Sequence, residues 1–98
     1  MTVLLVRSTV RPEFVADLEA SRARMFTAIE RERPVGVRYA SYRLADGVTY
    51  VAELEIAEGV ENPLPGIEEF REFQAGLKEW LAAPPSVERF EVRASYSG

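Results

Sequence analysis

Four short segments of the chain have the hydrophobic pattern of β-strands. They span residues 3–8, 37–44, 48–56 and 87–96. The first is apolar on both faces, which predicts a central strand, whereas the last has one apolar and one polar face. Asp46-Gly47, between the second and third segments, is a dipeptide typical of tight hairpins, so these two strands are expected to pair.

Two longer segments repeat apolar residues at intervals of three and four, as amphipathic helices do. The first starts near Pro12 and ends before Pro34 and Gly36, and the second is stopped by Pro84-Pro85. Their apolar positions are Phe14, Val15, Leu18, Met25, Phe26 and Ile29 in the first, and Ile67, Phe70, Phe73, Leu77, Trp80 and Leu81 in the second. Acidic residues come early and basic residues late in each segment, which the helix dipole favours.

The resulting order is strand, helix, strand, strand, helix, strand. With short, right-handed connections this order gives a ferredoxin-like βαββαβ fold, an α+β domain whose antiparallel sheet has the order 4-1-3-2. That order makes the strands at 3–8 and 48–56 central, in agreement with their apolar character. Residues 1–98 are expected to form this single domain.

Two helices cover only one face of a four-stranded sheet. We expect the other face to be apolar as well, with Tyr50 and Leu54 on it, and nothing in the chain remains to cover it. A second copy of the sheet is the simplest cover for such a surface. The sequence therefore predicts a homodimer formed through the sheet faces, a dimeric α+β barrel.

The composition excludes several classes of site. The chain has no histidine and no cysteine, which excludes Ser-His and Cys-His catalysis, zinc modules, iron–sulfur clusters and haem held by these residues. No carboxylates have metal-ligand spacing, so we expect neither a metal nor a cofactor. The net charge of −4 disfavours binding to nucleic acid or to an anionic membrane. Without a membrane-length apolar run or a secretory signal, the expected location is cytoplasmic.

Three short pieces of sequence carry a resemblance to a known family. They are Pro-Val-Gly-Val-Arg-Tyr at 34–39, Tyr-Val-Ala-Glu at 50–53 and Phe-Arg-Glu-Phe-Gln at 70–74. On these pieces, and over nearly its whole length, the chain resembles the antibiotic biosynthesis monooxygenase-like dimeric α+β barrels. The resemblance implies a ligand cavity between the sheet and the helices. It also implies oxygenation of quinol-type compounds without a cofactor as one activity within the family.

The chain departs from this family at two positions. Glu55 stands where the family's enzymes often have a tryptophan, and Glu72 stands where they often have a histidine. Haem-degrading members use a histidine of the second helix to hold iron. This chain is therefore not expected to degrade haem in that way.

Glu53 is the leading candidate for a catalytic base. It is a carboxylate in a predicted central strand, on the face that we expect to meet the helices, and burial makes a carboxylate a stronger base. The alternative is a structural carboxylate that pairs with Arg38, Arg43 or an arginine of the first helix.

Five side chains are candidates for contacts with a ligand: Met25, Phe26, Tyr39, Phe73 and Trp80. Together they offer a large apolar surface with a hydroxyl group, which suits a small apolar aromatic compound. The helical residues among them are core residues by default, and a buried tyrosine requires only a hydrogen-bond partner for its hydroxyl.

These observations lead to two main functional hypotheses. The first is a cofactor-independent monooxygenase acting on a small phenolic or quinol-type aromatic compound. The second is a non-catalytic α+β barrel that binds a small molecule or responds to stress, and a purely structural dimer is a third. A cavity with a polar group between helices and sheet would favour the first two hypotheses, whereas a closed apolar core would exclude the first.

Overall fold

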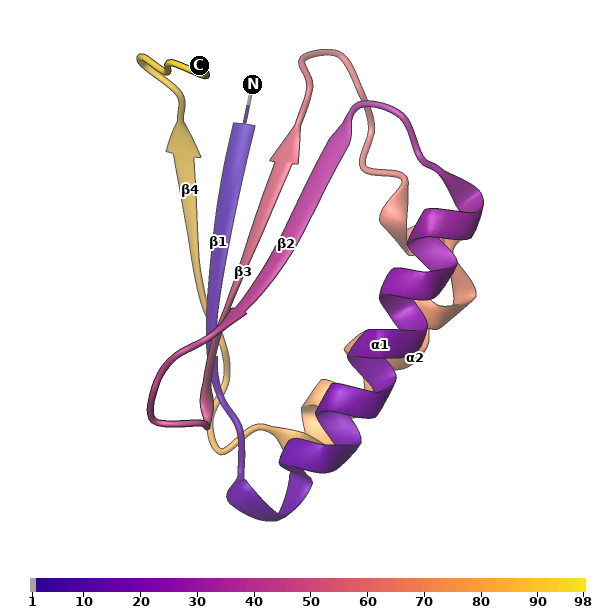
Figure 1. The fold of residues 1–98 in the computed structure, drawn as a ribbon, viewed down its shortest axis with the longest axis vertical. Helices are drawn as coiled ribbons and strands as arrows, with labels where there is room; N and C mark the ends of the chain where they lie inside the picture. The colour runs from indigo at the N-terminus through magenta and orange to yellow at the C-terminus, as the bar shows by residue number, and fades with distance from the viewer. Residues whose placement is uncertain (1) are drawn as a thin grey trace.

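The computed structural model describes residues 2–98 and shows an antiparallel sheet with both helices on one of its faces (Figure 1). The strands are β1 (Thr2–Thr9), β2 (Val37–Arg43), β3 (Thr49–Ile56) and β4 (Ser86–Glu91). The helices are α1 (Val15–Glu32) and α2 (Glu68–Trp80), preceded by the short 3-10 turns η1 (Pro12–Phe14) and η2 (Leu64–Gly66). The order β2-β3-β1-β4 is the predicted order 4-1-3-2 read from the other edge, so the predicted fold is confirmed.

The connection between β2 and β3 is the hairpin that Asp46-Gly47 predicts. The Asp46 carboxylate accepts hydrogen bonds from the backbone N–H groups of Val48 and Thr49, at 2.9 and 2.8 Å, and from the Thr49 hydroxyl at 2.6 Å. These bonds, with the hydroxyl bond contributing most, lower the pKa of Asp46. Gly47 has φ +78°, a conformation that strains residues with a side chain, which is why glycine is favoured there.

Strand β4 is shorter than the sequence pattern predicts. It ends at Glu91, which pairs with Thr2 of β1, whereas the alternation of apolar and polar residues continues to residue 96. The residues after Glu91 have no strand partner among those described, so the pattern alone does not extend the sheet. All of β4 is exposed, because it forms one edge of the sheet.

The pairing register determines which side chains face the helices. Directly paired residues of neighbouring strands point to the same face of the sheet. The helix-facing pairs of the two central strands are Leu4 with Leu54, Val6 with Ala52, and Ser8 with Tyr50. Glu53 lies between Ala52 and Leu54 in β3, so its side chain points to the opposite, uncovered face, where it pairs with Leu5 and Ala40.

The predicted faces of β3 were therefore wrong. Glu53 was expected toward the helices and Tyr50 and Leu54 away from them, and the structure shows the reverse. The physical reason is that a uniformly apolar row of side chains gains most from packing against the helices. The other row carries two carboxylates, Glu53 and Glu55, which remain partly exposed to water and so avoid the cost of burial.

The core lies between the helices and the sheet. Its larger cluster of buried residues consists of Val10, Leu18, Met25, Tyr50, Phe73 and Leu81. A smaller cluster, formed by Ala28, Leu54, Leu64 and Ile67, fills the other end. Trp80 is partly buried against the larger cluster, and its indole folds back over Gly76 and meets the Phe73 ring edge-on at 6.4 Å.

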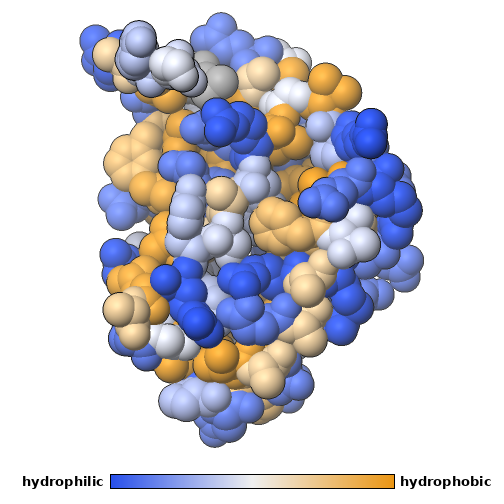
Figure 2. Space-filling model, in the orientation of Figure 1, coloured by the Kyte–Doolittle hydropathy of each residue, from blue (hydrophilic) through white to orange (hydrophobic). Residues whose placement is uncertain are grey.

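Within residues 2–98, neither helix has the length and apolar character that crossing a membrane requires. The surface seen in the orientation of Figure 1 is a mosaic of polar and apolar side chains (Figure 2).

Candidate functional site

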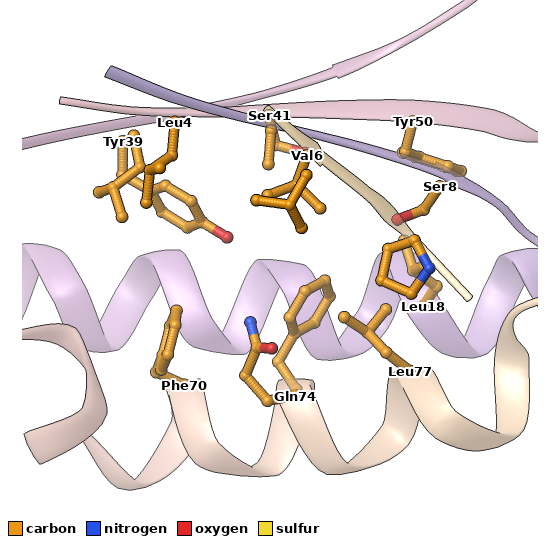
Figure 3. Close-up of a pocket in the computed structure, with 15 residues that line it drawn as sticks. Leu4, Val6, Ser8, Leu18, Tyr39, Ser41, Tyr50, Phe70, Gln74 and Leu77 are labelled. Atoms are coloured by element: carbon orange, nitrogen blue, oxygen red, sulfur yellow. The ribbon is translucent and has the colours of Figure 1, made fainter. Parts of the chain in front are cut away.

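A cavity of about 230 Å³ lies between the sheet and the helices. Strands β1, β2 and β3 form its roof and helix α2 most of its floor, with Leu18 from α1 and Pro85 and Val87 from the β4 side (Figure 3). Most of the lining is apolar. Its polar side chains are Ser8, Tyr39, Ser41, Tyr50 and Gln74. None of the described residues that line the cavity carries a charge at neutral pH.

Three aromatic rings build one end of the cavity. The Tyr39 ring stacks on Phe26 of α1, with ring centroids 5.3 Å apart and planes only 6° from parallel. On its other side, Phe70 of α2 meets Tyr39 edge-on at 6.2 Å. This packing fixes the ring of Tyr39, so that its hydroxyl is held in one place.

The Tyr39 hydroxyl and the Gln74 amide both point into the space between sheet and helices (Figure 3). Among residues 2–98, neither group forms a hydrogen bond with another protein group. Every fully buried side-chain oxygen or nitrogen in this part of the chain has a hydrogen-bond partner. Because the Tyr39 hydroxyl has none, it is not fully buried, and it opens onto the cavity that Tyr39 lines. The two groups are thus available to a ligand.

Burial raises the pKa of Tyr39 to about 12. The hydroxyl therefore keeps its proton at neutral pH and acts as a hydrogen-bond donor, not as a base. A fixed neutral donor in an apolar cavity suits a ligand oxygen that carries partial or full negative charge.

The raised pKa of Tyr39 makes stability depend on pH in the alkaline range. Because the folded protein holds this proton more tightly than the unfolded chain, the free energy of unfolding should fall as pH rises from about 10 to about 12, by about 2–3 kcal/mol in total. Urea denaturation at a series of pH values should show this fall in the wild type, and Tyr39→Phe should remove that part of it. An identical pH dependence in both proteins would contradict the assignment.

A polar network fixes the opposite wall of the cavity. Tyr50 donates its hydroxyl proton to Glu19 Oε2 at 2.5 Å, and Arg22 pairs with Glu19 Oε1. Arg22 also donates to Ser41 Oγ at 3.3 Å and places its guanidinium carbon 5.6 Å from the centroid of the Tyr50 ring. Arg43 Nη1 lies 3.9 Å from Glu19 Oε2. Burial, and then the bond to Glu19, raise the pKa of Tyr50, so this network also keeps its tyrosine neutral.

The structure separates the five predicted ligand contacts. Tyr39 and Phe73 line the cavity. Phe26 lies behind Tyr39 and supports its ring, and Met25 is completely buried in the core cluster. Trp80 packs on Gly76 and Phe73 and does not line the cavity. That these five residues contact a ligand remains a prediction.

The candidate base is not at the cavity. Glu53 lies on the uncovered face of the sheet, one residue from the cavity-lining Ala52 and Leu54. Its catalytic role stays a prediction that this position does not favour. The alternative, a pairing with Arg38, Arg43 or an arginine of the first helix, is not seen within residues 2–98 either. Arg38 pairs with Glu55 at 3.6 Å, and Arg43 and the helical Arg22 pair with Glu19.

Sequence reasoning identified Tyr39 but did not assign Gln74, Glu19 and Arg22 to the site. Gln74 belongs to the second helix and follows Phe73 directly, so its place beside an apolar stripe was a usable signal. Glu19 and Arg22 are spaced three apart on a helix, which predicts an ion pair. Nothing in the sequence indicates that this pair meets Tyr50, which lies 31 positions from Glu19.

In the part of the chain that the structure describes, no three side chains of the metal-ligating types come together as a metal ion would need.

The chain is similar in structure to several solved proteins over almost its full length. Rv0793 from Mycobacterium tuberculosis has a TM-score of 0.78 and 24% sequence identity, covering 98% of both chains. SnoaB, a cofactor-independent oxygenase from Streptomyces nogalater, has a TM-score of 0.70 and 18% identity, covering 96% of this chain and 94% of its own. An antibiotic biosynthesis monooxygenase has a TM-score of 0.72 and 12% identity, over 96% of this chain and 100% of its own.

No protein-family model and no curated protein matches the sequence. The sequence-based resemblance is confirmed at the level of structure: this chain has the fold of the antibiotic biosynthesis monooxygenase-like proteins.

Proposed function

We propose that the chain is a cofactor-independent monooxygenase-like protein whose cavity takes a small phenolic or quinol-type aromatic compound. The observation that supports this most is the uncharged cavity with two unpartnered polar groups, the Tyr39 hydroxyl and the Gln74 amide. The fold it shares with a cofactor-independent oxygenase adds to that support.

The size of the cavity limits the ligand. An apolar cavity of about 150 Å³ in another protein binds benzene. A cavity of about 230 Å³ therefore suits a compound of one or two rings. Because none of the described lining residues is ionised, the cavity favours aromatic rings that carry no ionised substituent inside it.

The chemistry proposed here needs only the compound and oxygen. A phenol loses its proton to water, the resulting anion passes two electrons from a ring carbon to O2, and the carbon–oxygen bond that forms gives a peroxide anion, which takes up a proton from water. Loss of water then leaves a quinone, so that one phenol and one O2 give one quinone and one H2O. The neutral Tyr39 O–H would stabilise the phenolate oxygen, and Gln74 would orient it.

Oxygen consumption tests this function. With a panel of naphthols, quinols and anthrones, the rate for the wild type should rise with pH as the substrate itself ionises, because none of the described lining residues is a ready base. Tyr39→Phe should lower kcat/KM by about tenfold or more, the usual effect of losing a hydrogen bond to a charged oxygen. Glu53→Gln, on the other face of the sheet, is the matched control and should leave the rate unchanged.

Two outcomes would contradict this account. If Glu53→Gln abolishes oxygen consumption, then Glu53 is the base after all. If the wild type binds the panel but consumes no oxygen, the second hypothesis is correct and the protein binds its ligand without chemistry. The uncharged lining, which offers no base, is the observation that favours this alternative.

We also propose that the protein is a homodimer formed through the uncovered sheet face. Apolar side chains on that face include Leu5, Tyr42, Val51 and Phe90, and the last is 42% exposed. Glu53 and Glu55 lie on the same face, so the interface must pair or hydrate these two carboxylates. An obligate interface here should bury on the order of 2,000 Å² or more. Light scattering should then give twice the chain mass of 11.0 kDa.

The dimer proposal has a matched pair of variants. Phe90→Glu should produce the monomer, because it places a charge within the interface, whereas Tyr96→Glu, at a residue 93% exposed, should leave the dimer intact. A stable wild-type monomer at micromolar concentration would refute the proposal.

A further inference from the structure

An open hollow adjoins the cavity at the end of α2. It has a volume of about 580 Å³ and is lined by Gln74, Leu77, Lys78, Leu81 and residues 82–85. We call it the outer hollow. Three of its residues, Gln74, Leu77 and Pro85, also line the cavity. The two spaces therefore adjoin along these three side chains, and a ligand that reaches both must pass between them.

Lys78 is the charged residue of the outer hollow and the only lysine of the chain. Its side chain is exposed, and no ion pair within residues 2–98 involves it. Glu79 follows Lys78 in the sequence but does not line the hollow. The ammonium group of Lys78 is thus free to bind an anion from solution, in a protein whose net charge is −4.

Helix α2 sets the distance between the cavity and this cation. Phe70, Gln74 and Lys78 are four residues apart and so lie on successive turns of one helix face. Phe70 packs on Tyr39 at the inner end, and Gln74 lines both the cavity and the outer hollow. Lys78 is one turn further, about 5–6 Å along the axis. A compound with a hydroxyl at one end and an anionic group at the other matches this order.

We propose that Lys78 binds an anionic group of the cavity's ligand, and that the ligand is therefore an amphipathic aromatic acid. Its rings lie in the uncharged cavity with a hydroxyl toward Tyr39 and Gln74, and its carboxylate or sulfonate lies in the outer hollow. This inference rests on the proposed ligand cavity and adds the charge and shape of the compound. It does not depend on whether the compound is oxidised.

Two probes of equal ring size separate the roles of cavity and lysine. 2-Naphthol carries the rings and the hydroxyl alone, and 6-hydroxy-2-naphthoate adds a carboxylate at the far end. Calorimetric titration should show that Lys78→Met, which keeps the apolar stem, weakens binding of the acid about three- to fivefold, the range of an exposed charge pair. Its affinity for 2-naphthol should not change. Added salt should weaken binding of the acid only.

Arg24→Met is the matched control, because it removes an equal charge from an exposed position of α1 that lines neither the cavity nor the outer hollow. It should change the affinity for neither probe. The inference is overturned, with the cavity proposal intact, if 2-naphthol binds and Lys78→Met leaves the acid unaffected or weakens both probes equally. If neither probe binds the wild type, both the inference and the cavity proposal fail.

Discussion

Met25→Ala should destabilise the protein by about 2–5 kcal/mol, the range for truncating a fully buried methionine. Met25 has no exposed surface and lies in the core cluster with Leu18 and Phe73. The substitution removes these contacts and leaves a cavity that the surrounding helix and sheet cannot fill. Urea denaturation at fixed protein concentration measures the loss, since dimerisation would make stability depend on concentration.

Met25→Leu is the control for this prediction, because it nearly conserves volume and should cost less than about 1.5 kcal/mol. Ligand affinity of Met25→Ala should stay close to that of the wild type, since Met25 does not line the cavity. A small loss of stability together with a large loss of affinity would instead support the sequence-based prediction that Met25 contacts the ligand.

Gly76→Ala should destabilise the protein, although the same change in an exposed helix stabilises by about 1 kcal/mol. A Cβ at Gly76 would overlap with the six-membered ring of the Trp80 indole, so the indole must leave its place against Phe73. The expected net cost is about 1–3 kcal/mol, as for other overpacked sites. Thermal or urea denaturation of the single variant measures it.

The sign of this effect should reverse when the indole is absent. In a Trp80→Ala background, Gly76→Ala meets no ring and should raise stability by up to about 1 kcal/mol. If Gly76→Ala already stabilises the wild-type protein, the indole does not rest on this glycine.

The elements of the fold could be predicted because their patterns are local. The apolar stripe at 67–81 gave a helix that the structure places at Glu68–Trp80, and Asp46-Gly47 gave the hairpin turn. The end of β4 could not be predicted, because it depends on its partner strand. Apolar and polar residues still alternate after Glu91, but the last described pair between β1 and β4 is Thr2 with Glu91.

The faces of β3 show where chemical expectation misled the prediction. A strand with one uniformly apolar row should bury that row, and Tyr50, Ala52 and Leu54 do face the helices. The expectation of a buried catalytic carboxylate assigned Glu53 to that side instead. If the faces had been assigned by polarity alone, both Glu53 and the row of Tyr50, Ala52 and Leu54 would have been placed correctly.

The candidate site was predictable only in part. Tyr39 and Phe73 were identified because large aromatic residues must pack between helices and sheet. The cavity itself depends on how particular side chains fail to fill that space, which no spacing along the chain encodes. The same holds for the bond between Tyr50 and Glu19, two residues that only the fold brings together.

The proposed function depends on the binding of a ligand in the space between sheet and helices. Calorimetric titration of 2-naphthol into the wild type and into Ala52→Phe tests it most directly, because Ala52 lines the cavity and a phenyl ring there would occupy it. We expect saturable binding to the wild type and none to an Ala52→Phe protein whose near-UV circular dichroism shows that it is folded. Equal affinity of the two proteins would contradict it.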